Sequence, residues 1–491
     1  MIILISVGES KDKGDLMKDL LIKTVEFGQK LGATYAEIRL QEIYKTVIST
    51  KDGRVEVVTE GLETGAGIRV LVDGAWGFST VSGTSKETLM EGMEKAVKMA
   101  RAASKSIKEK IELADVKAVE DKVKVKPKVD PRDVSPEEKV DLLLKLDSTL
   151  FSISNSIKSC TIDYADIIGT QYFASSDGTY IEQDKLYVWS RIFASAREGD
   201  IFASGREEFG STAGFVIWRQ NPPEEVARRL GERLLMQLKA KTPKGGAFPV
   251  VMGPNVVGVF AHEAFGHLAE ADLTYAGSVI KDLIGKQVAS PLITIIDDGT
   301  LEGGFGSFRY DDEGVPAQKT ILVKDGVVVS LMFNREYTAK FQKIVEGLPE
   351  DIRETFEVKL TGNARAEDFR VPPLIRMRNT YIKPGDYSFE ELLEGIKFGY
   401  YVKYFRGGQA NLDGTFQVGI QEAYEIVNGE IGDPVRNMSI SGNTLETLKK
   451  VDAVGKDFEV GAGRCGKGQT AFVGDGGPHV RVKELIVGGE M

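Results

Sequence analysis

The stretch VVGVFAHEAFGHLAEAD, residues 256–272, contains the residues that decide how the rest of the chain is interpreted. It contains two of the three histidines among 491 residues, His262 and His267, with Glu263 between them. Neutral imidazole is a common zinc ligand, and a carboxylate beside the metal is the usual base of a metalloprotease. The apolar residues before His262 are typical of a buried helix. The stretch therefore predicts a helix that carries metal ligands into the interior.

The spacing of the two histidines requires a distortion of that helix. His262 and His267 lie five positions apart, whereas side chains on one face of a helix lie three or four apart. At ~100° per residue the two side chains are separated by roughly 140°, which is too wide for one metal ion. We therefore expect a one-turn π-bulge, which Gly266 would tolerate. In the alternative, the helix ends here and His267 is a core histidine.

A catalytic zinc takes three protein ligands and leaves one position for water, so a third ligand is needed. The chain has only two cysteines, and one of them lies in the glycine-dense stretch VGAGRCGKGQ, residues 460–469, which predicts a loop that can approach a buried ion. Glu270 is another candidate, because it follows His267 by three residues and could share its helical face. The residues alone leave four candidates for the third ligand: Cys465, Glu270, His479 and Cys160.

Together with Cys465, the HEAFGH motif resembles the TldD/PmbA family, and in particular its TldD-type, metal-bearing branch. The similarity extends over most of the chain and includes IIDDGTLEGGFGSFRYDDEGVPAQKTILVKDG (295–326), IRMRNTYIKPGD (375–386), FRGGQANLDGTFQVGIQEAYEIVNGE (405–430) and RCGKGQ (464–469).

The resemblance implies a zinc peptidase with the motif HExxxH. Carried over position by position, it implies that His262, His267 and Cys465 bind Zn²⁺ and that Glu263 is the catalytic carboxylate. It also implies a dimer, formed with itself or with a PmbA/TldE-like paralogue, that acts on peptides or unfolded polypeptides. The PmbA-type paralogues lack the motif, and this chain keeps all four residues.

Composition narrows the class of protein. A hydrophobic content of 42% with 28% charged residues is typical of a globular protein, and 491 residues suffice for two domains. A net charge of −10 gives no general reason to bind nucleic acid. Two cysteines fit a reducing cytoplasm better than a disulfide framework. We expect no membrane span, and we expect the N-terminal MIILISVGES to be a strand or ordered tail and not a signal peptide.

The order of predicted elements indicates an α+β fold. We expect an N-terminal α/β domain with a mixed or antiparallel sheet over residues 1–241, including a charged surface connection over about 104–134. A β-rich C-terminal domain that carries the motif helix follows over residues 242–491, and TPKGG (242–246) marks the boundary. Strands and helices do not alternate regularly, which argues against a doubly wound parallel sheet.

Local signals place several elements. Helices are expected over 14–32, after capping boxes at Thr84-Ser-Lys-Glu87 and Ser135-Pro-Glu-Glu138, and after Asn221. Strands are expected over 158–218. Residues 411–426 alternate as a strand, which is either an exposed edge on which a peptide could pair or part of a simple hairpin. Turns are expected at Asp52-Gly53, Asp73-Gly74, Asp177-Gly178, Asp298-Gly299, Asp325-Gly326 and Asn428-Gly429.

The function that these residues favour is zinc-dependent hydrolysis of peptide bonds in short or unfolded polypeptides, with Glu263 as the general base. Two alternatives from other classes remain. One is a non-catalytic interaction or modulator protein of the same family, although a scaffold would not need the histidine pair, the glutamate and the cysteine together. The other is a zinc hydrolase of non-peptide amides.

Overall fold

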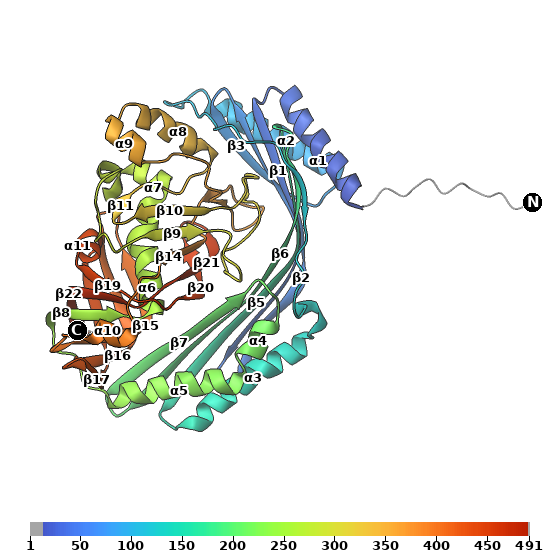
Figure 1. Cartoon of the computed structure of the whole chain (residues 1–491). Coiled ribbons are helices and arrows are strands. Elements are labelled where there is room, and N and C mark those ends of the chain that lie inside the picture. The colour runs from blue at the N-terminus through green and yellow to red at the C-terminus, as the bar shows by residue number, and fades with distance from the viewer. Residues whose placement is uncertain (1–12, 490–491) are drawn as a thin grey trace, which may run out of the picture.

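The computed structural model describes residues 13–489, and the expected N-terminal strand or tail lies outside this range. The first half of the chain forms one curved sheet, which lies beside a second half that contains three sheets (Figure 1). The α+β class is confirmed, with helices on the first sheet and a β-rich second half. Over residues 13–489 no helix combines the length and the apolar character needed to cross a membrane.

The first sheet has seven strands in the order β3-β2-β1-β5-β6-β4, with β7 paired to β6. All its pairings are antiparallel except β4 with β6. Its strands are β1 (Tyr35–Lys51), β2 (Arg54–Val72), β3 (Ala75–Ser82), β4 (Glu120–Val123), β5 (Ile157–Ser175), β6 (Tyr180–Glu198) and β7 (Ile201–Ser211). The charged segment 104–134 thus contributes β4 to the sheet.

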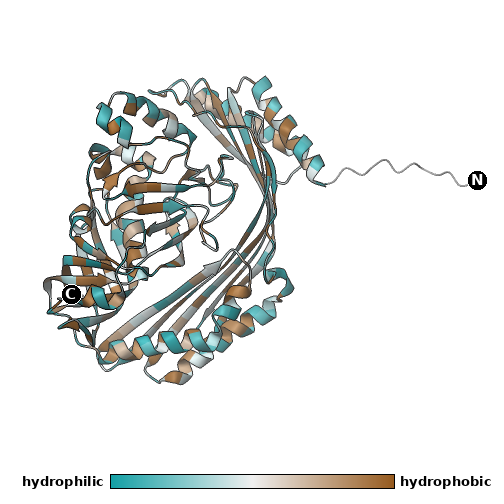
Figure 2. Cartoon of the chain, in the orientation of Figure 1, coloured by the Kyte–Doolittle hydropathy of each residue, from teal (hydrophilic) through white to brown (hydrophobic). Residues whose placement is uncertain are grey.

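Helices cover the convex face of this sheet and leave the concave face turned toward the second half (Figure 1). The helices are α1 (Lys13–Lys30), α2 (Lys86–Ala103), α3 (Pro136–Ile153), α4 (Val216–Gln220) and α5 (Pro223–Lys239). Helices α1 and α5 carry both hydrophobic and hydrophilic residues, as expected when one side packs on a sheet (Figure 2). The period of two in the strands matches this arrangement, because Cys160 and Ile162 of β5 lie in the core with α3 and α5.

Two larger sheets form the second half. A six-stranded sheet has the order β11-β10-β9-β14-β21-β20, and a seven-stranded sheet has the order β15-β8-β22-β18-β16-β17 with β19 paired to β22. The first contains β9 (Ile295–Asp298), β10 (Lys319–Lys324), β11 (Val327–Val328), β14 (Asn379–Ile382), β20 (Glu459–Gly466) and β21 (Thr470–Gly477). The second contains β8 (Gly246–Met252), β15 (Phe398–Ala410), β16 (Thr415–Val427), β17 (Glu430–Val435), β18 (Met438–Asn443), β19 (Val451–Val454) and β22 (Val480–Gly489).

The remaining elements of this half are short. They are the strand pair β12 (Ala364–Arg365) and β13 (Leu374–Ile375), and the helices α6 (Pro254–Val259), α7 (Ala271–Ala276), α8 (Arg335–Glu346), α9 (Glu350–Thr355), α10 (Phe389–Leu393) and α11 (Thr444–Lys449). Helix α6 packs against strands of both large sheets, β14, β20 and β21 on one side and β15 on the other. The motif is therefore placed between the two sheets.

Several local predictions are confirmed and others are wrong. The capping box of Ser135 and Glu138 is present, but helix α2 is capped by Ser85 and not by Thr84. The strands predicted over 158–218 end at residue 211, and 216–220 form α4. All the predicted turn pairs connect neighbouring paired strands except Asp298-Gly299. There the chain runs on through residues 299–318 before β10 begins, and this loop reaches the first sheet, where the Tyr310 carbonyl accepts a bond from Gln183 Nε2 (3.1 Å).

The proposed exposed edge at 411–426 is wrong. Strand β16 pairs with β15 along one side and with β17 and β18 along the other, so its backbone has no free edge for a peptide over the paired residues. The simple hairpin interpretation is confirmed instead.

Helix α6 can lie against β21 only because residue 258 is glycine. A Cβ atom at Gly258 would lie 2.4 Å from the backbone nitrogen of Gly476, and a backbone atom cannot move aside as a flexible side chain can. Gly258→Ala should therefore lower stability by about 1–3 kcal/mol, as overpacking does, even though alanine favours a helix by about 1 kcal/mol over glycine. Chemical denaturation would measure the change.

The matched control is Gly61→Ala on exposed β2, where no neighbouring part of the described chain lies within 4 Å of the added Cβ. Equal stability of the two variants would contradict the close approach of α6 and β21.

Candidate metal centre

A π-helical turn brings the two histidines of the motif together. It spans Phe260–Gly266, directly after α6, and the backbone N–H of His267 donates to the carbonyl of His262, five residues earlier. The two imidazole rings consequently lie with their centroids 5.3 Å apart and nearly perpendicular. The predicted π-bulge is confirmed. A single continuous motif helix is not present, because a 3-10 turn (His267–Ala269) and α7 follow.

The role of Gly266 differs from the expected one. Its φ of −54° is ordinary helical backbone, so the turn itself does not demand glycine. A Cβ atom at this position would instead lie 2.1 Å from the sulfur of Met377. A side chain at residue 266 would therefore require the buried Met377 to shift.

Cys465 completes a group of three donors. Its sulfur lies 3.4 Å from Nε2 of His267, and one donor atom from each of His262, His267 and Cys465 lies within 4.8 Å of the others. The expected loop around Cys465 is wrong, because the cysteine belongs to β20, and its side chain is only 6% exposed. Arg376 holds the end of this strand by donating to the carbonyls of Cys465 and Gln469, both at 2.7 Å.

Glu270 lies behind His267. Its buried carboxylate accepts a hydrogen bond from His267 Nδ1 at 2.9 Å, and the ammonium of Lys467 lies 3.2 Å away. A histidine whose Nδ1 donates in this way presents Nε2 as a ligand, and outer partners of this kind orient the ring. Lys467 also pairs with Asp272 at 2.7 Å, which connects the segment after Cys465 to the helix after the motif.

The other two candidates for the third ligand lie elsewhere. His479 Nδ1 donates to the carboxylate of Asp457 at 2.7 Å, and its Nε2 is hydrogen-bonded to the Tyr401 hydroxyl at 3.0 Å. Cys160 lies in the core of the first sheet. Among the residues that the structure describes, the histidine pair and Cys465 are the one group of three or more ligand-type side chains close enough to hold an ion.

The electrostatics of the centre favour a thiolate. Burial opposes ionisation of Cys465, but the two histidines outweigh it and lower the pKa of the thiol to about 4. Burial likewise opposes protonation of His267, yet hydrogen bonds with Cys465 and Glu270 raise its pKa to about 10. Without a metal the group is thus a thiolate neutralised by imidazolium, and a divalent cation can replace the protons.

The chemistry of these donors fits zinc. Two imidazoles and one thiolate are ligands that Zn²⁺ prefers, and three protein ligands leave one position open, as in catalytic sites. Nδ1 of His262 is buried and has no hydrogen-bond partner among the described residues, so this ring is less tightly oriented by the protein than that of His267.

Glu263 lies beside the three donors and reaches solvent. Its Oε2 is 3.9 Å from Nε2 of His267, and its side chain is 33% exposed, whereas the cysteine is buried. Together with His262 and Cys465 it lines a cavity of about 130 Å³. This position, beside the donors and open to the cavity, is suited to proton transfer.

The cavity is also lined by residues that the sequence did not single out, among them Arg206, Tyr404 and Asp475. Burial, opposed by His262, raises the pKa of Asp475 to about 6. No motif connects these residues with the histidines, because they come from β7, β15 and β21. Strand pairing brings Asp475 to the centre, since it lies opposite Gly461 of β20 and Thr380 of β14.

The state of Cys465 can be tested in zinc-free protein. A pKa of about 4 means that the ultraviolet absorbance of its thiolate, taken as wild type minus Cys465→Ser, should persist from about pH 8 down to about pH 5. Cys160 should not contribute, because burial raises its pKa well above the ordinary value. Loss of the signal near the ordinary thiol pKa would contradict the pairing with the histidines.

The role of Glu270 predicts an effect on metal affinity. Glu270→Gln removes the charge that orients His267 and should weaken zinc binding by about 10–100-fold, as measured by competition with a chromophoric chelator. Glu350→Gln, on the exposed part of α9, is the control. If both variants bind zinc as the wild type does, Glu270 has no orienting role.

The chain is similar in sequence to known proteins. Models of three PmbA/TldA metallopeptidase domains match the chain: domain 1 at residues 36–104, the central domain at 129–238 and the C-terminal domain at 245–489. A metalloprotease of Methanothermobacter thermautotrophicus is 41% identical over 93% of this chain and 95% of its own. A zinc metalloprotease TldD homolog of Saccharolobus solfataricus is 36% identical over 96% of this chain and 100% of its own.

The fold has also been seen before. The crystal structure of TldE from Thermococcus kodakarensis matches 96% of this chain and 100% of its own with a TM-score of 0.74, at 20% identity. The three domain matches, which together cover most of the chain, and the relatives above 30% identity show that this protein belongs to the PmbA/TldD metallopeptidase family.

Proposed function

We propose that this protein is a zinc-dependent peptidase that hydrolyses peptide bonds in short or unfolded polypeptides. The observation that carries the proposal is the convergence of His262, His267 and Cys465 within 4.8 Å of one another, with Glu263 beside them in a cavity. The names of the relatives, metalloprotease and zinc metalloprotease TldD homolog, support the same reaction class.

The three donors would hold the metal, and Glu263 would move the proton. When bound, zinc lowers the pKa of a coordinated water and polarises the scissile carbonyl. Glu263 accepts the proton of the attacking water and returns it to the leaving amine, which its place between solvent and the donors allows. Glu270 keeps His267 in the tautomer that binds metal.

The size of the cavity supports an unfolded substrate. About 130 Å³ beside Glu263 admits a stretch of extended chain or a side chain, but not a folded domain. A peptide bond would therefore reach Glu263 on an extended or exposed segment. We further propose a cytoplasmic protein, in keeping with its two free cysteines. We also propose a dimer, either with itself or with a TldE-like paralogue, as the family resemblance implies.

The proposal is tested by zinc content and peptide cleavage measured on the same preparations. Wild type should hold about one zinc per chain and cleave a mixed-peptide substrate. Glu263→Gln should keep the zinc and lose at least ~100-fold in turnover, because it removes the general base. Cys465→Ala should lose the metal.

Cys160→Ala is the matched control and should keep both zinc and activity, since this cysteine lies in the other half of the molecule. Full turnover by a zinc-loaded Glu263→Gln protein would exclude the proposed base. Zinc that binds without any cleavage of peptides would favour a non-catalytic role or an amide substrate of another kind.

A further inference from the structure

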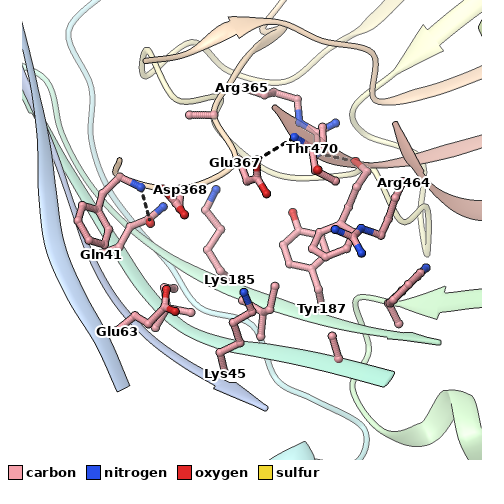
Figure 3. A pocket seen from close by; sticks show the side chains of 18 of the residues that line it. Gln41, Lys45, Glu63, Lys185, Tyr187, Arg365, Glu367, Asp368, Arg464 and Thr470 are labelled. Carbon is pink, nitrogen blue, oxygen red and sulfur yellow. Dashed lines mark hydrogen bonds between the residues drawn. The ribbon is translucent and has the colours of Figure 1, made fainter. Parts of the chain in front are cut away.

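A larger cavity lies between the concave face of the first sheet and the second half of the chain (Figure 3). Its volume is about 430 Å³. One wall is formed by alternate side chains of β1, β5 and β6, namely those that point away from the helices. The opposite wall comes from the segment 365–369 and from strands β20 and β21. The cavity is thus built by both halves of the molecule.

Aromatic rings line the side of this cavity nearest the metal centre. Tyr187 of β6 stacks on Phe472 of β21, with ring centroids 4.8 Å apart and an interplanar angle of 28°. The guanidinium of Arg464 lies over Trp189, 4.8 Å from the ring centroid. Such surfaces bind aromatic and apolar side chains through area and stacking.

Most acidic groups of the cavity are already engaged. Glu63 pairs with Arg370 at 2.8 Å and Asp163 with Arg191 at 2.9 Å. Asp312 lies 3.7 Å from Lys185, and Glu367 accepts the backbone N–H of Thr470 at 2.9 Å. Glu367 has no cationic partner among the described residues, but a backbone donor already holds one of its oxygens.

Three basic groups of the cavity have no ion pair within the described residues, but one of them, Arg365, donates to the backbone carbonyls of Met377 and Phe472. The other two are Lys45 and Arg464. Within residues 13–489, neither Lys45 nor Arg464 has a carboxylate at ion-pair distance, and both side chains project toward the open space in Figure 3. Lys45 comes from β1 and Arg464 from β20, so they approach the cavity from its two walls. A cation that has no carboxylate partner and projects into a recessed cavity is suited to bind an anionic ligand group.

Arg464 connects this cavity with the metal centre. It precedes Cys465 in β20 and lines both the large cavity and the cavity that contains Glu263. Because neighbouring side chains of a strand point to opposite faces, Cys465 faces the histidines while Arg464 faces Trp189. A chain that lies across the metal centre would enter the large cavity past Arg464.

We propose that the large cavity is a substrate-binding subsite that takes a peptide carboxylate next to an aromatic or apolar side chain. Arg464 and Lys45 bind the carboxylate, and the walls of Tyr187, Trp189 and Phe472 bind the side chain. The carboxylate comes either from an acidic residue or from the peptide's C-terminus. This inference rests on the proposed function for the identity of the ligand as a peptide.

Binding, measured apart from cleavage, tests the subsite. The zinc-loaded Glu263→Gln protein is titrated with fluorescein-labelled hexapeptides by fluorescence anisotropy. The reference peptide is Ala-Ala-Phe-Gln-Ala-Ala-amide. One variant replaces Gln with Glu, and another has a free C-terminus. We expect one or both carboxylate peptides to bind about tenfold more tightly than the reference, as charge-assisted hydrogen bonds require. The variant that gains affinity identifies the source of the carboxylate.

The same titration is repeated after Lys45→Gln or Arg464→Gln is added. Each change should reduce the preference for the carboxylate peptide to about twofold or less. Arg219→Gln, on the exposed part of α4, should leave it unchanged. Zinc content is measured for each protein, because Arg464 adjoins a proposed ligand. Lys45 lies on another strand, so Lys45→Gln tests charge recognition separately from loss of metal.

The outcomes distinguish this inference from the proposed function. Equal binding of all peptides, or a preference that survives Lys45→Gln, overturns the subsite even if the wild type cleaves peptides. A carboxylate preference that depends on both residues supports the subsite even if no peptide is cleaved, and the failure then concerns the proposed reaction alone.

Discussion

One backbone hydrogen bond determines the geometry of the centre, the bond from the N–H of His267 to the carbonyl of His262. An α-helical bond at this point would send the two imidazoles in different directions, and the extra residue held in the π-turn brings them back to one side. The π-turn also depends on its surroundings. Helix α6, which precedes it, must approach β21 at Gly258, and Gly266 must leave space for Met377. The positions without side chains therefore decide where the donors lie.

The sequence correctly predicted those features of the fold that depend on local residue spacing. The five-residue interval between the histidines predicted the π-turn, and Ser135 with Glu138 predicted the start of α3. The sequence placed Cys465 in a loop because of its many glycines, but β20 forms by pairing with β21, and pairing partners cannot be derived from local composition. Asp298-Gly299 likewise has the composition of a tight turn, but a long loop follows it and contacts the first sheet.

Residue spacing alone also left the third ligand open among four candidates, and the resemblance to a family chose between them. The structure explains why spacing was insufficient. Glu270 is as close to His267 as the spacing suggests, but it lies on the Nδ1 side of the ring, while Cys465 lies on the Nε2 side. The number of residues between two positions does not determine which ring nitrogen of the histidine a neighbouring side chain contacts. The same limit hid Asp475 and Tyr404, which reach the centre from separate strands.

The third donor follows the second by 198 residues, and this separation affects how the centre comes into being. A chain synthesised only as far as the histidines holds two imidazoles and no thiolate partner. The strand that supplies Cys465 must be made, paired with β21 and laid against the motif before the set is complete. Assembly of the centre is therefore a late event of biogenesis, and a nascent or truncated chain that ends before β20 lacks the complete set of donors.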